Sequence, residues 1–283
     1  LWLIALLVGT AVGGAALIFR YLIGWVQWLW LGTTSEWIIA GVKALPWWTV
    51  VAAPMVGGLV VGLLNQYVLP GRRPGAVADV IEASARGGAG LCLRQGLFSA
   101  LATAISLGAG ASAGREGPVI HLGATLATAL TRAIKLSPQA GRVVLACGVA
   151  SAISASFNAP IAGALFATEV VVGQYALKTF APIVVASVAG TALSHIHFGE
   201  VNAFLLGDNY IASFWEFPAF ILLGVVAAVA AMVLMQSIFL SQRLAQAIPL
   251  PNWVKPAIAG AAVGVIAIWL PQVLSVGYGF AEW

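Results

Sequence analysis

Charged residues are scarce in this chain, and their scarcity decides which class of protein it belongs to. Asp, Glu, Lys and Arg make up 8% of the 283 residues, whereas hydrophobic residues make up 61%. Soluble domains carry about a quarter of their residues as charged side chains. So few charges cannot cover a water-facing surface, which excludes an ordinary soluble domain and favours a chain embedded in a membrane.

Residues that form disulfides, bind metals or carry out catalysis are also few. The two cysteines, Cys92 and Cys147, lie in apolar stretches and make no disulfide framework, so we expect both to be buried. His195 and His197 are two residues apart and do not share a helix face. Ser112 has no base to activate it. We therefore expect no enzyme, no metal site and no cofactor, and the scattered basic residues predict loops rather than a nucleic-acid surface.

Long runs without any charge predict membrane-spanning helices. Five such runs cover 1–19, 44–71, 143–168, 217–242 and 256–281, and a helix needs about 20 apolar residues to cross the hydrocarbon layer. We predict a short amphipathic helix near 76–85 and spans near 2–28, 47–69, 92–109, 116–131, 143–155, 159–172, 179–196, 214–237 and 254–270. The fourth, fifth and sixth of these spans are too short to cross the membrane fully.

The distribution of Lys and Arg predicts the orientation of these spans. If the first span runs from inside to outside, ten of the thirteen basic residues fall on the cytoplasmic side, as the positive-inside rule requires. The outside then keeps Arg20, Lys43 and Arg115, together with an acidic loop that carries Glu200, Asp208 and Glu216.

Two segments predict helices that begin within the membrane region. One reads Glu116-Gly117-Pro118 and the other Asn158-Ala159-Pro160. Proline suits the first turn of a helix because its missing N–H would be unpaired there anyway. A helix start has free N–H groups and a partial positive charge, which together favour an anion. We therefore expect an anion site at these broken helices, where glycine lets the ion approach the backbone.

Glu116 is the acidic side chain at the mouth of this expected site. When ionised it would occupy the site and exclude anions, and when protonated or swung away it would vacate it. An ionisable residue within a membrane is a functional candidate. The alternative is that Arg115 and Glu116 simply pair and cap the helix.

GREGP at 114–118 and FNAPIAGALFATE at 157–169, with short spans between them, resemble the CLC family of chloride channels and proton-coupled chloride transporters. The resemblance runs along the whole chain and implies an all-α membrane protein with a CLC-like inverted-repeat fold of short, broken and tilted helices. It also implies a homodimer in the lipid bilayer, a pore in each subunit and Glu116 as the gate. Gly114, Arg115, Gly117 and Pro118 are then the neighbours of the gate at the anion site.

The chain departs from the family pattern at two positions of the site. Where the family has an anion-binding serine before a short helix, this chain has Gly75, followed by Ala76, so a hydroxyl ligand is lost although the helix start remains. Where the transporters carry a proton-relaying acid, this chain has Val170, which resembles the passive channels. Glu169 is adjacent but should face elsewhere, and we expect it to be a buried, hydrogen-bonded carboxylate. His121, five residues after Glu116, is expected to be a packing histidine with satisfied hydrogen bonds.

We expect residues 1–283 to form an incomplete CLC-type transmembrane domain, the first repeat plus the start of the second. The chain has no initiator Met and lacks the family's second-half pore loop. The leading hypothesis is a multi-pass protein of the cell membrane that conducts chloride passively through a voltage- or pH-gated pore. The alternatives are a proton-coupled antiporter of chloride, another halide or nitrate, and a non-conducting scaffold.

Overall fold

The computed structural model describes residues 1–35, 38–86, 90–173, 176–199 and 213–277, and in these residues the chain is helical without any strand. The elements, in chain order, are α1 (Trp2–Leu31), α2 (Ile39–Ala44), α3 (Trp47–Tyr67), η1 (Pro70–Arg72), α4 (Val77–Ala85), α5 (Leu93–Gly108), α6 (Glu116–Ala133), α7 (Pro138–Phe157), α8 (Pro160–Phe166), η2 (Ala167–Val172), α9 (Leu177–Phe198), α10 (Glu216–Ala247), α11 (Lys255–Trp269) and η3 (Pro271–Val273). The expected all-α fold is confirmed, and each predicted helix has a counterpart.

The chain divides into two compact units. The first consists of Leu1–Ala203 together with Asn252–Trp283, and the second is Phe204–Pro251, which contains α10. Five described helices, α1, α3, α7, α9 and α10, are long and apolar enough to cross a membrane. The acidic residues Glu200 and Asp208 lie outside the described residues.

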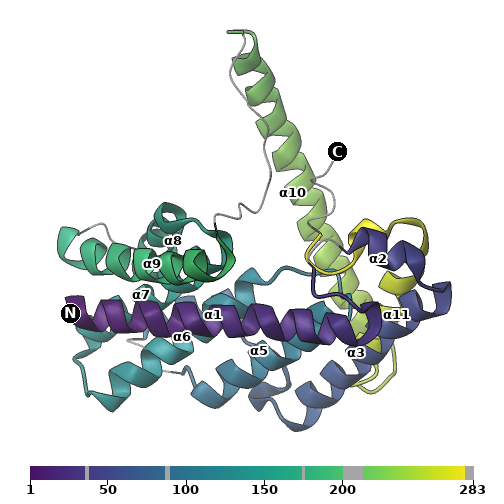
Figure 1. Ribbon diagram of the computed structural model, residues 1–283, viewed down its shortest axis with the longest axis horizontal. Coiled ribbons are helices and arrows are strands. Elements are labelled where there is room, and N and C mark those ends of the chain that lie inside the picture. The colour runs from purple at the N-terminus through teal and green to yellow at the C-terminus, as the bar shows by residue number, and fades with distance from the viewer. Residues whose placement is uncertain (36–37, 87–89, 174–175, 200–212, 278–283) are drawn as a thin grey trace. The chain divides into compact units, whose positions relative to one another are not determined.

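Helix α7 forms the centre of the first unit. Every residue from Val143 to Ala155 is buried, and the helix packs against α1, α6, α8 and α9. In Figure 1, α1 runs along the unit with α8 and α9 on one side and α5 and α6 on the other. A helix that is apolar on all sides is expected at such a central position.

The predicted length of α7 was wrong. The sequence favoured a short segment over 143–155, but the helix begins at Pro138, where the Ser137 hydroxyl accepts a hydrogen bond from the Ala140 N–H at 3.4 Å. Its 20 residues are enough to span a membrane. Arg142 lies within the helix, and its guanidinium donates to the carbonyl of Val172 at 3.4 Å.

Small residues let the long helices approach closely. A Cβ added to Gly9 of α1 would lie 2.6 Å from the carbonyl oxygen of Ala186 in α9, and one added to Gly123 of α6 would lie 2.6 Å from that of Gly148 in α7. Close backbone packing of this kind holds helices together in lipid, where the hydrophobic effect gives no attraction between them. The second of these contacts holds α6, which carries part of the candidate site, against α7.

Candidate functional site

Helix α6 begins at Glu116, as the sequence predicted, with Arg115 as its N-cap residue and Pro118 in its first turn. The Glu116 side chain is exposed and its carboxylate folds back over Gly114, because a Cβ added to Gly114 would collide with Glu116 Oε2. Gly114 therefore provides the room in which the carboxylate lies. A negative charge in the first turn interacts favourably with the helix dipole.

Arg115 connects the start of α6 to the second broken helix. Its side chain is 5% exposed, Nη2 donates to the carbonyl oxygen of Ser156 at 3.0 Å, and the guanidinium lies 6.0 Å from the ring centroid of Phe157. These two residues end α7. Asn158 follows in the left-handed conformation, with φ 55°, and α8 begins at Pro160. The Asn-Ala-Pro segment thus starts a new helix, as the sequence predicted.

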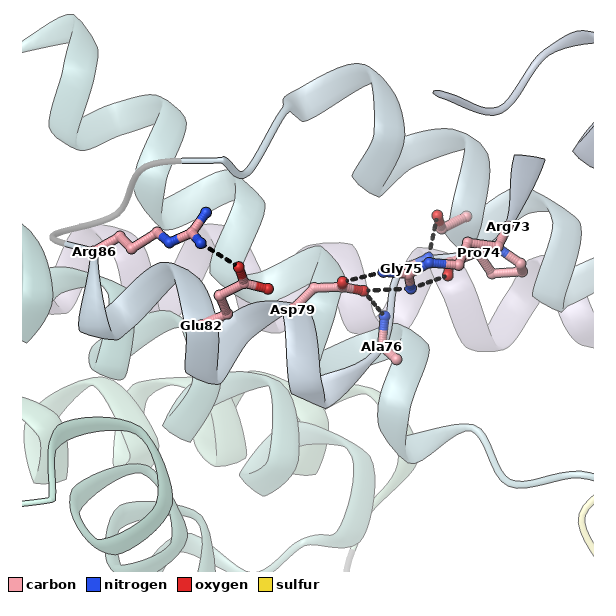
Figure 2. Close-up of polar contacts among 8 residues, drawn as sticks. Arg73, Pro74, Gly75, Ala76, Asp79, Glu82 and Arg86 are labelled. Carbon is pink, nitrogen blue, oxygen red and sulfur yellow. Dashed lines mark hydrogen bonds and ion pairs between the residues drawn. The ribbon is translucent and has the colours of Figure 1, made fainter. Parts of the chain in front are cut away.

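The start of α4 holds the other pair of expected anion-binding residues, Gly75 and Ala76 (Figure 2). The Gly75 N–H donates to Ser99 Oγ of α5 at 2.9 Å, and the Ala76 N–H donates to Asp79 Oδ2 at 2.7 Å. Both amides are therefore already bonded to protein oxygens. The expected dipole partner Asp79 does lie in the first turn of α4.

Arg73 neutralises Asp79 at this helix start. Its guanidinium nitrogens lie 3.0 and 2.6 Å from the two carboxylate oxygens (Figure 2). This hydrogen bonding holds the pKa of Asp79 below its ordinary value, against the opposing effect of burial. The pair lies outside the spanning helices, and the Arg73 side chain is 61% exposed.

The starts of α4 and α6 lie against each other. A Cβ on Gly117 of α6 would be 4.0 Å from Val77 Cγ2, and one on Gly75 would overlap the ring of His121. Through Arg115, the start of α6 also reaches the junction of α7 and α8. The structure thus gathers Gly75, Ala76 and 114–118 in one region.

Two predictions about ionisable residues near the site were wrong. His121 is fully buried, as expected of a packing residue, but neither ring nitrogen has a hydrogen-bond partner in the described part of the chain. Glu169 was expected to be buried but is exposed. It lies in the π-helical turn η2, whose buried residues are Ala167, Thr168, Val171 and Val172, so Glu169 falls on the other face. Val170 is half-buried.

Cys92 also differs from the expectation. Cys147 is buried in α7, but Cys92 is exposed because it is the N-cap residue of α5, at the end of the preceding loop. Apolar neighbours in sequence do not bury a residue at a helix end.

A cavity of about 260 Å³ opens beside the loop that precedes α6. The loop pairs with the segment after η3: the Ser275 N–H donates to the Gly110 carbonyl at 3.3 Å, and the Ala113 N–H donates to the Ser275 carbonyl at 3.4 Å. The cavity is lined by Ser112, Ala113, Gln272, Val273, Ser275 and neighbouring residues. Sequence reasoning missed this cavity because it joins segments that lie far apart in the chain.

Comparison with known sequences gives one consistent family. The family model described as "Voltage gated chloride channel" matches residues 57–283. A ClcB-like protein of Ralstonia nicotianae is 34% identical over 279 residues, which cover 97% of this chain and 65% of that protein. Chloride channel protein CLC-e of Arabidopsis thaliana is 28% identical, with 97% of this chain and 40% of that protein covered. The chain therefore spans less than two thirds of the length of these relatives.

Two solved structures share the fold. A slow cyanobacterial Cl⁻/H⁺ antiporter superposes with a TM-score of 0.80 at 19% identity, covering 98% of this chain and 65% of that one. A CLC-type fluoride/proton antiporter superposes with a TM-score of 0.77 at 21% identity, covering 96% and 65%.

Proposed function

Because the chain belongs to the voltage-gated chloride channel family, we propose that the whole protein conducts chloride passively through a pore gated by Glu116. The observation that carries the proposal is the meeting of the α4 and α6 starts, with Glu116 at the first position of α6. The chain is a multi-pass membrane segment. The resemblance to the family further supports a homodimer with one pore in each subunit.

The start of α6 offers few but sufficient donors for an anion. The Val119 N–H already donates to the carbonyl of Arg115 at 3.2 Å, and Pro118 has no N–H to give. The amides of Glu116 and Gly117 are therefore the first-turn donors outside the helical ladder. An anion at these amides competes with the Glu116 carboxylate for the same positive end of the helix, which gives the carboxylate the role of a gate.

Val170 favours passive conduction over proton-coupled transport, because its hydrocarbon side chain cannot carry a proton. The second candidate is proton-coupled anion antiport, and the observation that favours it is Glu169, an exposed carboxylate one residue away. The two similar solved structures are antiporters, but at their level of identity the likeness extends to the fold alone.

Reconstitution of the full-length protein in liposomes tests the proposal. With an outward chloride gradient, we expect chloride to leave without stoichiometric proton uptake, and we expect Glu116→Gln to change this flux and its response to pH. Uphill proton movement driven by the chloride gradient would show that the protein is an antiporter and would overturn passive conduction. If no anion moves in either direction, both transport functions fail and a scaffold remains. Competition by fluoride and nitrate measures which anion the pore prefers.

A further inference from the structure

The loop between α5 and α6, residues 109–115, leads directly to Glu116. It begins after Gly108, the last residue of α5, and ends at Arg115, the N-cap residue of α6. Its end is held by the hydrogen bond from Arg115 to the carbonyl of Ser156. Its start and its middle are held by residues of α1 and of the segment that follows η3.

Trp30, near the end of α1, holds the start of the loop. Its side chain is half-buried, and the indole Nε1 donates to the carbonyl of Gly108 at 2.7 Å. The last carbonyls of a helix have no partner within that helix, so the indole supplies one where α5 gives way to the loop. Trp25 and Trp28 of the same helix are 74% and 57% exposed, as is typical of tryptophans that anchor a helix at the membrane surface.

Gly110, in the middle of the loop, packs against two large side chains. A Cβ added to Gly110 would lie 3.2 Å from Leu274 Cδ2 and 3.5 Å from Trp30 Cζ2. The φ of Gly110 is 101°, a value that residues with a side chain rarely adopt. Leu274 is 1% exposed and packs in a small apolar cluster to which Trp30 also belongs. The loop backbone is therefore enclosed at this point.

Ser275 fixes the same part of the loop through its backbone. Its N–H donates to the carbonyl of Gly110 at 3.3 Å, and its own carbonyl accepts from the N–H of Ala113 at 3.4 Å. Ser275 has a φ of 60°, in the left-handed region that few residues other than glycine adopt. Such a conformation persists only where the surrounding structure imposes it, and the two bonds to the loop do so here.

The position of the loop determines where the Glu116 carboxylate lies. Only Gly114 and Arg115 separate Ala113 from Glu116, and the carboxylate lies over Gly114. A shift of the loop at Gly110 or Ala113 would therefore move the backbone on which the carboxylate rests.

We propose that Trp30 is a positioning residue for Glu116. Its indole N–H and its ring fix the loop, and the fixed loop holds the carboxylate at the start of α6. A loosened loop should make ionised Glu116 a weaker competitor of an anion for that helix start. The inference rests on the proposed function, because it takes Glu116 as the gate.

Chloride flux from liposomes that contain the full-length protein tests the effect on the gate. Trp30→Phe removes the N–H donor and shortens the ring, so we expect flux at neutral pH to rise by about two- to tenfold, the range for one ordinary hydrogen bond. Flux at acidic pH should change little, because a protonated Glu116 no longer competes. Trp25→Phe, at an exposed tryptophan of the same helix, is the matched control and should behave like the wild type.

A double variant shows whether Trp30 acts through Glu116. In a Glu116→Gln background, Trp30→Phe should leave flux unchanged, because no charged carboxylate remains to be positioned. A merely structural role for Trp30 would change flux equally in both backgrounds, and this result would overturn the inference.

Hydrogen exchange in the purified protein tests the hold on the loop without any transport. The amides of Gly110, Ala111 and Ala113 are hydrogen-bonded, and in Trp30→Phe a peptide covering 109–115 should exchange about two- to tenfold faster than in the wild type. Leu274→Val, which shortens the other side chain against Gly110, should act in the same direction and replaces Trp30→Phe if that variant does not fold. Unchanged exchange in these variants would overturn the inference.

The two readouts separate the inference from the proposed function. If Glu116→Gln alters flux while Trp30→Phe alters neither flux nor exchange, the inference fails and the proposed function stands. If Glu116→Gln leaves flux unchanged, the proposed function fails, yet faster exchange in Trp30→Phe would still show that Trp30 fixes the loop.

Discussion

The guanidinium of Arg115 donates to the backbone carbonyl of Ser156, 41 residues further along the chain. The bond ties the residue before α6 to the end of α7, next to the junction at which α8 begins. A local pairing of Arg115 with its neighbour Glu116, the alternative that the sequence allowed, would not have produced this connection.

Replacing Arg115 should therefore destabilise the fold. Arg115→Ala removes a charge-assisted hydrogen bond and leaves the half-buried Ser156 carbonyl without that donor, so we expect a loss of about 2 kcal/mol. Thermal unfolding in detergent measures it. Arg115→Lys keeps the charge but not the planar donor geometry, and it should recover only part of the loss. An unchanged unfolding temperature in Arg115→Ala would show that the tether does not support the fold.

Gly75→Ala should be destabilising because its methyl group overlaps the His121 ring. Overpacking of this kind costs about 1–3 kcal/mol. Gly14→Ala is a matched control, since its Cβ would meet Leu193 Cδ2 at an ordinary 3.7 Å. In a double-mutant cycle with His121→Ala, the cost of Gly75→Ala should largely disappear. Additive effects of the two changes would contradict the overlap.

Glu116→Gln should abolish the pH response of anion flux. If Glu116 is the gate, as proposed, its protonation removes the charge with which the carboxylate competes for the start of α6, so flux should rise on acidification. The amide carries no charge at any pH, and flux through the variant should be high and flat. Chloride flux from liposomes at two external pH values measures this, and Glu82→Gln, an exposed carboxylate bound to Arg86 on α4, serves as the control. If Glu116→Gln still responds to pH, another group is responsible for the pH response.

The pair of Arg73 and Asp79 gives a predicted pH dependence of stability. The pKa of Asp79 is lowered in the folded protein, so the ionised carboxylate stabilises the fold above its ordinary pKa of 3.8, and this contribution is lost as the pH falls through the lower folded value. Arg73 is largely exposed, so we expect less than about 1 kcal/mol. Asp79→Asn keeps an acceptor for the Ala76 N–H. The difference in unfolding temperature between Asp79→Asn and the wild type should shrink with acidification. A difference that grows would show that the pKa of Asp79 is not lowered by folding.

Local chemistry made the helix starts predictable. Pro118 and Pro160, each after a polar residue and a small one, marked the beginnings of α6 and α8, because the first turn of a helix depends on its own residues. The start of α7 was missed for the opposite reason: Arg142 was taken as a boundary, although a carbonyl 30 residues away accepts its hydrogen bond.

The surroundings of His121 could not be predicted from its own helix. Its contact is with Gly75, which lies just before α4 and comes 46 residues earlier in the chain. Periodicity along α6 gives the direction of the ring but not what faces it. The same limit applies to the cavity beside Ser112, which is also lined by residues after α11.

The burial of α7 constrains how the proposed pore can open. A rod enclosed on all sides by α1, α6, α8 and α9 cannot tilt or slide without breaking the packing of its neighbours, and rearrangements of packed helices take microseconds to milliseconds. Rotation of one exposed carboxylate about its own bonds takes picoseconds to nanoseconds. With Glu116 as the moving part of the proposed gate, opening and closing should leave the surrounding framework still.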